Sequence, residues 1–528
     1  MKTRSREPTP PRNRGANRLA DILAGISVAL VLLPQSLAYA ELAGMPAHHG
    51  LYVAAVAPLL AAIFASSPFL ATGPAAITSL LAFGALGGLG LTAQSETWVS
   101  MAALLTLLVG VFRVLFGLFK AGALAFFLSP PVLKGFTVGA AVLIAGSQLP
   151  TAIGVSGAEG GTLQRAGHAL INPELWHLPS IAVTAVTMLI ILVGKKIHAL
   201  FPGVLVAAIG GLVFSMAGGF DGAILETVPR GFPIPSVDMP WGDIGLLVVP
   251  AFVIALVGFA EPTAIARTYA AADRTRWDAN REFIAQGVAN IASGLVKGYP
   301  VGASFSRSAV NRLAGARTRW AGAVTGVVVI AFLPAANILE PLPRPVLAGI
   351  IIAAVIKLFD LKGLFTIWRY SWPQAFIATT TFVLTVALAP RIEQAVLAGL
   401  VLSIVVHSWR EIRIRIVTTH RDGRLLLAPK GILWFASADA LEERFLEQLS
   451  LHPDTDEVRV DLSGLGRIDY TGAVALHRLI QRAEDGGNTV TVCGAPPQTM
   501  RILGKVCPEL IDGSYVDKNP WLDVDASG

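Results

Sequence analysis

Charged residues are scarce in this sequence. Asp, Glu, Lys and Arg make up 14% of its 528 residues, against about 25% in typical soluble proteins. Apolar residues make up 54%, and the mean hydropathy is +0.63. The composition excludes a chain of several soluble domains and predicts an integral membrane protein with many spans.

Cysteine is also nearly absent. The two cysteines, Cys493 and Cys507, both lie in the polar C-terminal region at a spacing that matches no metal motif, so we expect two free thiols. The sequence contains no catalytic triad, nucleotide-binding loop or metal cluster. It therefore predicts neither an enzyme nor a bound cofactor or metal.

The basic residues do not form a nucleic-acid surface. The net charge is +6, but Lys and Arg are spread over alternate loops, as the positive-inside rule requires of a membrane protein. Residues 1–18 combine basic residues with prolines and predict a disordered cytoplasmic tail. The apolar run 22–40 that follows is longer than the apolar region of a cleavable signal peptide.

Fourteen apolar segments follow the tail, and the third and tenth are expected to be short or only partly helical. An even number of spans returns the C-terminus to the cytoplasm, and the loop charges agree with this count. We therefore expect a multi-pass protein of a cell membrane, a bacterial inner membrane, with both termini cytoplasmic. The segments are 20–42, 50–66, 73–91, 98–118, 122–149, 178–194, 201–219, 244–270, 282–297, 301–313, 320–337, 344–358, 373–389 and 392–409.

Two polar residues occupy corresponding positions in apolar spans. A charge such as Glu261 costs at least about 2.5–3.5 kcal/mol in the membrane, and Pro262 after it predicts an interrupted helix. Gln35 precedes the Gly/Pro-rich segment at Pro74 by 74 − 35 = 39 residues, and Glu261 precedes Pro300 by 300 − 261 = 39 residues. Two halves offset by 261 − 35 = 226 residues, each with an interrupted segment, predict an inverted-repeat transporter.

The interrupted segments are expected to place helix N-termini near the bilayer midplane. Their unpaired N–H groups and partial positive charge favour an anion. Small residues, hydroxyls and one permanent cation surround these termini and predict a pocket for a small oxyanion. The expected pocket residues are Thr72 and Ala75 in the third segment and Val301, Gly302, Ser304, Ser306 and Arg307 in the tenth.

Glu261 is the sole carboxylate of the eighth segment. Burial favours its protonated form, whereas the nearby cation Arg307 favours the carboxylate, so we predict a proton-coupling site. The alternative is a permanent ion pair that holds the two halves together. Glu41 is a secondary candidate, expected near the outer interface. Gln35 either lines the pocket or makes an interhelical hydrogen bond, and Tyr39 either lines the pocket or packs.

The composition changes after residue 410. Residues 411–423 predict a basic juxtamembrane linker, and residues 424–528 predict a small α/β domain, because strands alternate with helices. A Ser cap at Ser437 is expected to open its first helix. The expected strands are 425–428, 432–435, 458–462 and 489–493, and the expected helices are 437–449, 471–485 and 497–505.

Several motifs resemble the SulP family of anion transporters. They are PQSLAYAELAG (Pro34–Gly44), the TGPAAITSL run after Ala71, GFAEPTAIAR, and GASFSRSAVNRLAGARTRWAG (Gly302–Gly322). The segment DLSGLGRIDYTGAVAL (Asp461–Leu476) resembles the STAS domain that these proteins carry. The resemblance covers the whole chain after the basic tail.

The resemblance implies seven-plus-seven inverted repeats within residues 19–410, at about 19–220 and 243–410. A core domain (spans 1–4 and 8–11) would move against a gate domain (spans 5–7 and 12–14), with substrate between the facing ends of spans 3 and 10. It also implies homodimers. By position, the substrate residues are Gln35, Tyr39, Thr72, Ala75, Ser306 and Arg307, and the acidic residue tied to proton or sodium coupling is Glu261.

The resemblance to STAS domains points to Thr471 as a regulatory phosphorylation site, at the hydroxyl that bacterial anti-sigma antagonists phosphorylate. A threonine at this point is also the expected N-cap of the helix that follows. We expect the domain to support dimerisation, folding or regulation.

The sequence thus predicts a secondary active transporter in the bilayer that takes up a small anion, sulfate first, together with protons. Bicarbonate or a C4-dicarboxylate, with proton or sodium coupling, are alternatives. An uncoupled anion exchanger or channel, or a non-transporting sensor, are further ones. Relatives that carry bicarbonate tend to have Asp at the position of Glu261 and to lack the Ser306–Arg307 pair, which weakens the bicarbonate reading.

Overall fold

The computed structural model describes residues 14–126, 128–156, 160–225, 227–412, 414–421 and 423–508. The chain divides into two compact units, Met1–Val401 and Leu402–Gly528, and each is described by itself. Residues 1–13 of the predicted tail and 509–528 of the predicted C-terminal domain lie outside the described residues. Residues 14–18 of the predicted tail are helical, because α1 begins at Arg14.

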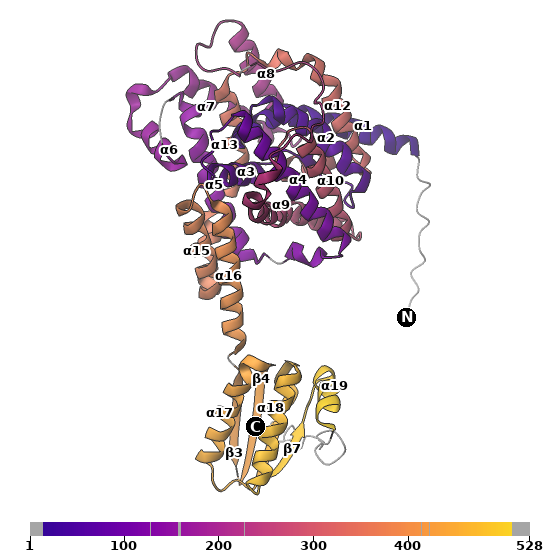
Figure 1. Ribbon diagram of the computed structural model, residues 1–528, viewed down its shortest axis with the longest axis vertical. Coiled ribbons are helices and arrows are strands. Elements are labelled where there is room, and N and C mark those ends of the chain that lie inside the picture. Colours follow the sequence, from indigo (N-terminus) through magenta and orange to yellow (C-terminus); the bar gives the residue numbers. More distant parts are fainter. Residues whose placement is uncertain are drawn as a thin grey trace. The chain divides into compact units, whose positions relative to one another are not determined.

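The first unit is built from α-helices (Figure 1). They are α1 (Arg14–Leu42), α2 (His48–Phe64), α3 (Ala76–Gly87), α4 (Glu96–Leu118), α5 (Pro130–Ile153), α6 (Thr162–Ile171), α7 (Leu178–Ile197), α8 (Gly203–Met216), α9 (Ile244–Ala272), α10 (Ala279–Leu295), α11 (Phe305–Leu313), α12 (Trp320–Phe332), α13 (Arg344–Val355), α14 (Leu361–Tyr370), α15 (Trp372–Ala387) and α16, which runs from Ile392 to Ile412. Two short strands, β1 (Thr72–Gly73) and β2 (Gly302–Ala303), precede α3 and α11.

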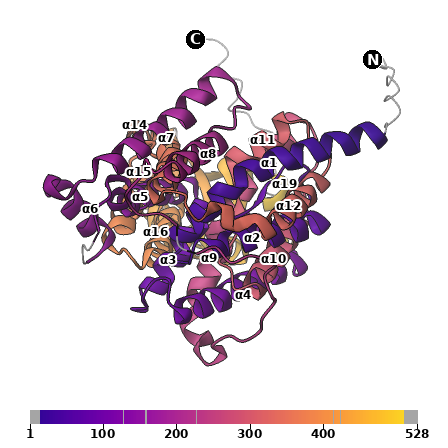
Figure 2. The same cartoon turned by 90° about the horizontal axis from the view of Figure 1, so that it is seen from above.

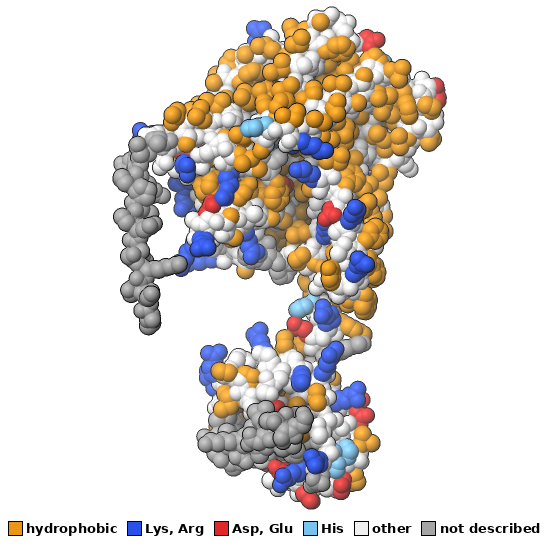
Figure 3. All heavy atoms as spheres, turned by 180° about the vertical axis from the view of Figure 1, so that it is seen from behind, with side chains coloured by type: hydrophobic (Ala, Val, Ile, Leu, Met, Phe, Trp, Pro, Cys, Tyr) orange, Lys and Arg blue, Asp and Glu red, His pale blue; other side chains and the backbone are white. Residues whose placement is uncertain are grey.

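Apolar side chains cover the outside of this unit. Leu189 on α7, Val213 on α8 and Val383 on α15 are each more than half exposed, and Figure 3 shows hydrophobic side chains over most of the visible surface. Within the described residues, 7 helices are long and apolar enough to cross a bilayer, and three shorter apolar helices accompany them. The unit is therefore the helical membrane core of a multi-pass protein.

Every predicted apolar segment contains a helix. The third and tenth are short, as expected: α3 has 12 residues and α11 has 9. Helices α6 and α14, which lie between the predicted segments, were not predicted.

The predicted interruption at Pro262 is wrong. Helix α9 runs unbroken through Pro250 and Pro262. A proline frees the carbonyl of the residue four positions earlier, here Gly258, and a helix in a membrane continues through a proline when neighbouring groups cover the freed backbone. The Gly258 oxygen lies close to strand β2, since a Cβ added to Gly302 would lie 3.5 Å from it.

The helices of this unit pack in two sets. In one set α4 packs on α9 and α10, and α12 packs on α1 and α2; in the other, α5 packs on α13 and α15, and α13 packs on α7. Figures 1 and 2 show α4, α9 and α10 together, with α5, α7 and α15 gathered elsewhere in the unit. The site described below lies where these sets meet.

The second unit contains a sheet with the strand order β3-β4-β5-β7, and β6 pairs with β4. β3 runs antiparallel to β4, whereas β5 and β6 are parallel to β4 and β7 is parallel to β5. The elements are β3 (Arg415–Arg421), β4 (Arg424–Leu433), α17 (Phe435–Leu451), β5 (Glu457–Asp461), β6 (Leu465–Ile468), α18 (Tyr470–Asp485), β7 (Thr489–Cys493) and α19 (Pro497–Val506).

Two predictions for this unit are wrong. Residues 411–423 are not simply a linker, because β3 occupies most of the segment and forms the edge of the sheet. The strands predicted at 425–428 and 432–435 are one strand, β4, whose two ends pair with different partners, β5 and β6. The predicted strand at residues 489–493 is confirmed as β7.

The predicted helix caps are also wrong. Asp469, not Thr471, caps α18: its carboxylate accepts a hydrogen bond from the Gly472 amide at 2.8 Å, and Thr471 lies exposed in the first turn. Helix α17 begins before Ser437, whose hydroxyl instead accepts a hydrogen bond from the Trp434 amide at 3.1 Å. Asp469 and Thr471 are two residues apart and both carry a side-chain oxygen that can cap a helix, so the sequence alone does not decide between them.

Candidate functional site

Strands β1 and β2 bring the two predicted pocket segments side by side. They pair antiparallel, Thr72 with Ala303 and Gly73 with Gly302. Each strand leads directly into the N-terminus of a short helix, α3 after Ala75 and α11 after Ser304. Two helix N-termini with small flanking residues therefore lie together, as expected for an anion site.

A buried polar framework on α10 holds this strand pair. The Gln286 side-chain amide donates a hydrogen bond to the Thr72 hydroxyl at 2.6 Å. Asn290 accepts from the Val301 amide at 3.0 Å and donates to the Val301 carbonyl at 3.2 Å. Because these side chains are fully buried, every hydrogen bond that they make helps to fix the strands in one position.

Arg113 belongs to the same framework. Its guanidinium is fully buried and donates to the carbonyls of Val301 at 2.8 Å, Ala255 at 3.2 Å and Ile254 at 3.3 Å. Arg113 was not predicted to belong to the site, although it lies within the predicted apolar segment 98–118. Its place inside an apolar run was the signal that it has buried partners.

Arg307 lies beneath the strand pair and is fully buried. Its guanidinium donates to the side-chain oxygen of Gln35 on α1 at 3.2 Å and to the carbonyl of Pro74. It therefore joins α11, α1 and the start of α3 through one cation. Its planar fork can serve both acceptors at once, which a lysine cannot do.

A cavity of about 630 Å³ lies in front of the two helix N-termini. It is lined by residues from both sets of helices. From the set that includes α1 and α9 come Gln35, Tyr39, Ala75, Ala76, Ile77, Val257, Ala260, Glu261, Ala264, Tyr269, Ser304, Phe305, Ser306 and Ala309. From the set that includes α5 and α7 come Leu133, Phe136, Thr137, Ile191, Leu192, Lys195, Val204, Ile350, Ala353, Ala354, Val355, Lys357 and Leu358.

The polar groups of the cavity wall gather around the N-terminus of α11. Glu261 on α9 accepts a hydrogen bond from the Phe305 amide at 3.2 Å. The hydroxyls of Ser304 and Ser306 are hydrogen-bonded to each other at 3.0 Å. A carboxylate thus occupies one of the backbone donors that an incoming anion would use.

The structure separates the predicted site residues into two groups. Six line the cavity: Gln35, Tyr39, Ala75, Glu261, Ser304 and Ser306. Four are buried in the framework behind it: Thr72, Val301, Gly302 and Arg307. Glu41 lies with neither group and is 3.5 Å from the guanidinium of Arg344.

Two charged residues of the cavity wall, Lys195 and Lys357, were not predicted to belong to the site. Lys195 lies in the last turn of α7 and Lys357 follows α13. With Arg307 behind the wall, they give the cavity more positive than negative charge, because Glu261 is the one carboxylate among its lining residues. Such a surface attracts anions.

Comparison with known proteins identifies the family of both parts of the chain. A model of the sulfate permease family matches residues 19–381, and a model described as "Mlab, STAS domain" matches residues 417–506. A probable sulfate transporter of Mycobacterium tuberculosis is 34% identical over 391 residues, which cover 73% of this chain and 69% of the relative. The sodium-independent sulfate anion transporter of Bos taurus is 29% identical over 529 residues, or 92% and 85% of the two chains.

Solved structures share the fold. Murine solute carrier 26 family member A9, in the inward-facing state, superposes with a TM-score of 0.83 at 20% identity, over 97% of this chain and 94% of that one. The transmembrane domain of the cyanobacterial bicarbonate transporter BicA superposes with a TM-score of 0.64 at 24% identity, over 74% and 97%. At these identities the likeness establishes the fold alone.

Fold and site together define a multi-pass membrane transporter of anions. The chain belongs to the sulfate permease family and carries a C-terminal STAS domain.

Proposed function

We propose that this protein takes up sulfate together with protons through the cavity between its two sets of helices. The observation that carries the proposal is the single carboxylate, Glu261, bonded to the backbone amide at the start of α11, beside two serine hydroxyls. The relatives described above are named as sulfate transporters, which supports the choice of anion.

The donors around the cavity suit a small, strongly hydrated oxyanion. The amides at the starts of α3 and α11 and the hydroxyls of Ser304 and Ser306 can each donate to a sulfate oxygen. The cavity of about 630 Å³ leaves room for water beside the anion. The positive charges of Arg307, Lys195 and Lys357 attract the negative charge of the anion.

Coupling follows from competition at one amide. While Glu261 is ionised, it accepts the Phe305 N–H and places a negative charge where the anion must bind. Protonation removes that charge and weakens the hold on the amide, so the anion binds more readily. By linkage, bound anion favours the protonated carboxyl to the same degree. Proton and anion therefore bind together, which defines a symporter.

The proposed motion is of the elevator type. The core would consist of α1–α4 and α9–α12, and the gate of α5, α7, α8, α13, α15 and α16, in two inverted repeats. The closest helix packing lies within each set, which supports two rigid bodies. The cavity draws its wall from both sets, so sliding of one against the other would expose it to either side of the membrane.

We further propose a bacterial inner membrane location, cytoplasmic termini and a homodimer to which the STAS domain contributes. Thr471 remains the proposed phosphorylation site. It is exposed in the first turn of α18, where the helix dipole favours a phosphate.

Uptake into proteoliposomes tests the substrate. Labelled sulfate should accumulate, and unlabelled sulfate should compete far better than bicarbonate or fumarate. If bicarbonate or fumarate competes better than sulfate, that anion rather than sulfate is the substrate. Equal competition by all three would favour an unselective exchanger or channel.

A further inference from the structure

Three metal-ligating side chains meet at one end of the sheet in the second unit, far along the chain from the transport site. His420 lies near the end of β3, His452 directly follows α17, and Asp454 lies in the turn before β5. Within the described residues they form the one group of at least three His, Cys, Asp or Glu side chains placed to hold a metal ion. We call them the His–His–Asp cluster.

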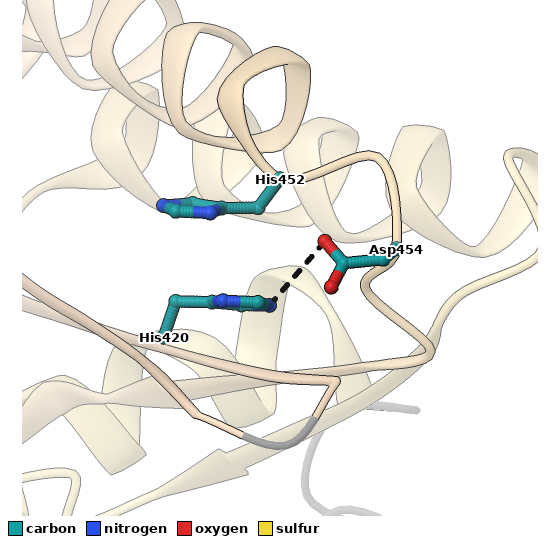
Figure 4. Close-up of side chains that lie close together, drawn as sticks. All are labelled: His420, His452 and Asp454. Carbon is teal, nitrogen blue, oxygen red and sulfur yellow. Dashed lines mark ion pairs between the residues drawn. The ribbon is translucent and has the colours of Figure 1, made fainter.

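The side chains of the cluster face one another (Figure 4). The two imidazole rings are stacked, with centroids 4.2 Å apart and an interplanar angle of 13°. The His420 Nε2 and Asp454 Oδ1 atoms are 3.7 Å apart, too far for a hydrogen bond. The buried Nε2 atom has no hydrogen-bond partner in the described part of the chain. A buried ring nitrogen without a hydrogen-bond partner lowers the free energy of unfolding, and a ligand that binds it would remove this cost.

The backbone that carries the cluster is held in place. The His452 carbonyl accepts hydrogen bonds from the Thr455 amide at 3.2 Å and hydroxyl at 2.8 Å. Asn488 donates to the Thr455 carbonyl at 2.6 Å, and the Asp456 amide donates to Gly423, at the start of β4, at 2.9 Å. The turn before β5 is thus fixed against the β3–β4 hairpin, so the backbone holds the three side chains close to one another.

We propose that His420, His452 and Asp454 bind a divalent transition-metal ion, zinc or one of similar preference. Two imidazoles and one carboxylate form a nitrogen-rich donor set that suits zinc rather than magnesium or calcium, which require oxygen ligands. One ligand atom from each residue lies within 4.8 Å of the others. Bonds of about 2.0–2.1 Å in a tetrahedron separate ligand atoms by about 3.3 Å. The remaining closure is a matter of side-chain rotation, and the Asp454 side chain, which is 71% exposed, is free to rotate.

Three protein ligands leave a fourth position for water. The metal would join β3, at the edge of the sheet, to the turn between α17 and β5. It would stabilise the folded unit by RT ln(1 + c/Kd), where c is the free metal concentration, so the stabilisation would rise with that concentration. The alternative is an ion pair between a protonated His420 and Asp454 without any metal. A metal site would bind zinc and lose stability in the presence of a chelator, whereas an ion pair alone would do neither.

Zinc binding by the full-length protein in detergent tests the proposal. The protein is purified through a tag without histidines, stripped with a chelator, and titrated with zinc against a chromophoric chelator. Variants His420→Gln and Asp454→Asn should each lose one zinc equivalent per chain that the wild type binds. His407→Gln should keep it, because His407 faces only Glu411, at 3.0 Å, and is exposed. If both cluster variants bind as much zinc as the wild type, the proposal is overturned.

A second measurement guards against misfolded variants. In chelator, Asp454→Asn should unfold at the same temperature as the wild type, because the exchange is isosteric and exposed. Added zinc should raise the unfolding temperature of the wild type and of His407→Gln, but not that of Asp454→Asn. An equal zinc-dependent rise in all three would assign the metal to other residues and overturn the proposal.

Discussion

Exchange of Arg307 for lysine should weaken anion binding without unfolding the protein. The guanidinium of Arg307 holds two acceptors, the Gln35 side chain and the Pro74 carbonyl, and so places the start of α3 against α1. A lysine keeps the charge but, as a compact point charge, can replace at most one of the two contacts. The experiment therefore separates geometry from charge.

The size of the effect follows from the lost contact. A hydrogen bond to a charged group contributes about 1.5–3 kcal/mol, which corresponds to a factor of about 10 to 150 in an equilibrium constant. We expect the KM for sulfate uptake of Arg307→Lys proteoliposomes to rise by a factor in this range. Gln35→Met, which removes only one acceptor, should produce a rise of similar direction.

Arg317→Lys is the matched control. Arg317 lies just after the same helix, its side chain is exposed and it does not line the cavity, so its exchange should change free energies by about 0.5 kcal/mol or less. A KM for Arg307→Lys within the range of this control, at an unchanged unfolding temperature, would refute the positioning role of Arg307.

Two further predictions concern packing and charge. Gly50→Ala should lower the unfolding temperature, because the added Cβ would lie 1.9 Å from the Ser36 carbonyl oxygen and such overpacking costs about 1–3 kcal/mol. Gly245→Ala should not, because open space surrounds Gly245. Equal unfolding temperatures of the two variants would contradict the close approach of α1 and α2. Lys357→Gln should slow sulfate uptake most at low ionic strength, where long-range electrostatic attraction is unscreened. Lys362→Gln, which lies outside the cavity wall, should not slow uptake. A loss of uptake rate in Lys357→Gln that does not depend on salt would argue against electrostatic attraction.

Most of the helices could be predicted because each lies in a continuous apolar segment, although within the described residues only 7 of them are long enough to cross a bilayer. The course of α9 through Pro262 could not, because the surroundings of the freed Gly258 carbonyl, with β2 close to it, are set by contacts between distant parts of the chain. The cap of α18 was mispredicted for a local reason: Asp469 and Thr471 both offer a suitable oxygen, and only the backbone conformation decides between them.

In the candidate site, too, some residues could be predicted from the sequence and others could not. Residues near the helix N-termini, such as Ser304 and Ser306, could be predicted from their small size and hydroxyls. The framework behind them could not be assigned, although Gln286 and Asn290 form a polar stripe at a spacing of one helical turn within an apolar segment. Nothing in the sequence says which neighbour that stripe faces, and the burial of Arg307 behind the cavity wall depends on the same packing.

Proton coupling at Glu261 is tested by uptake of labelled sulfate into proteoliposomes, with and without an inward proton gradient. Wild type and Glu41→Gln, whose carboxylate lies outside the cavity beside Arg344, serve as references. We expect the gradient to drive accumulation in both. Glu261→Gln should still exchange sulfate but should not concentrate it. Accumulation by Glu261→Gln equal to that of the wild type, or uptake by the wild type that ignores the gradient, would contradict the account.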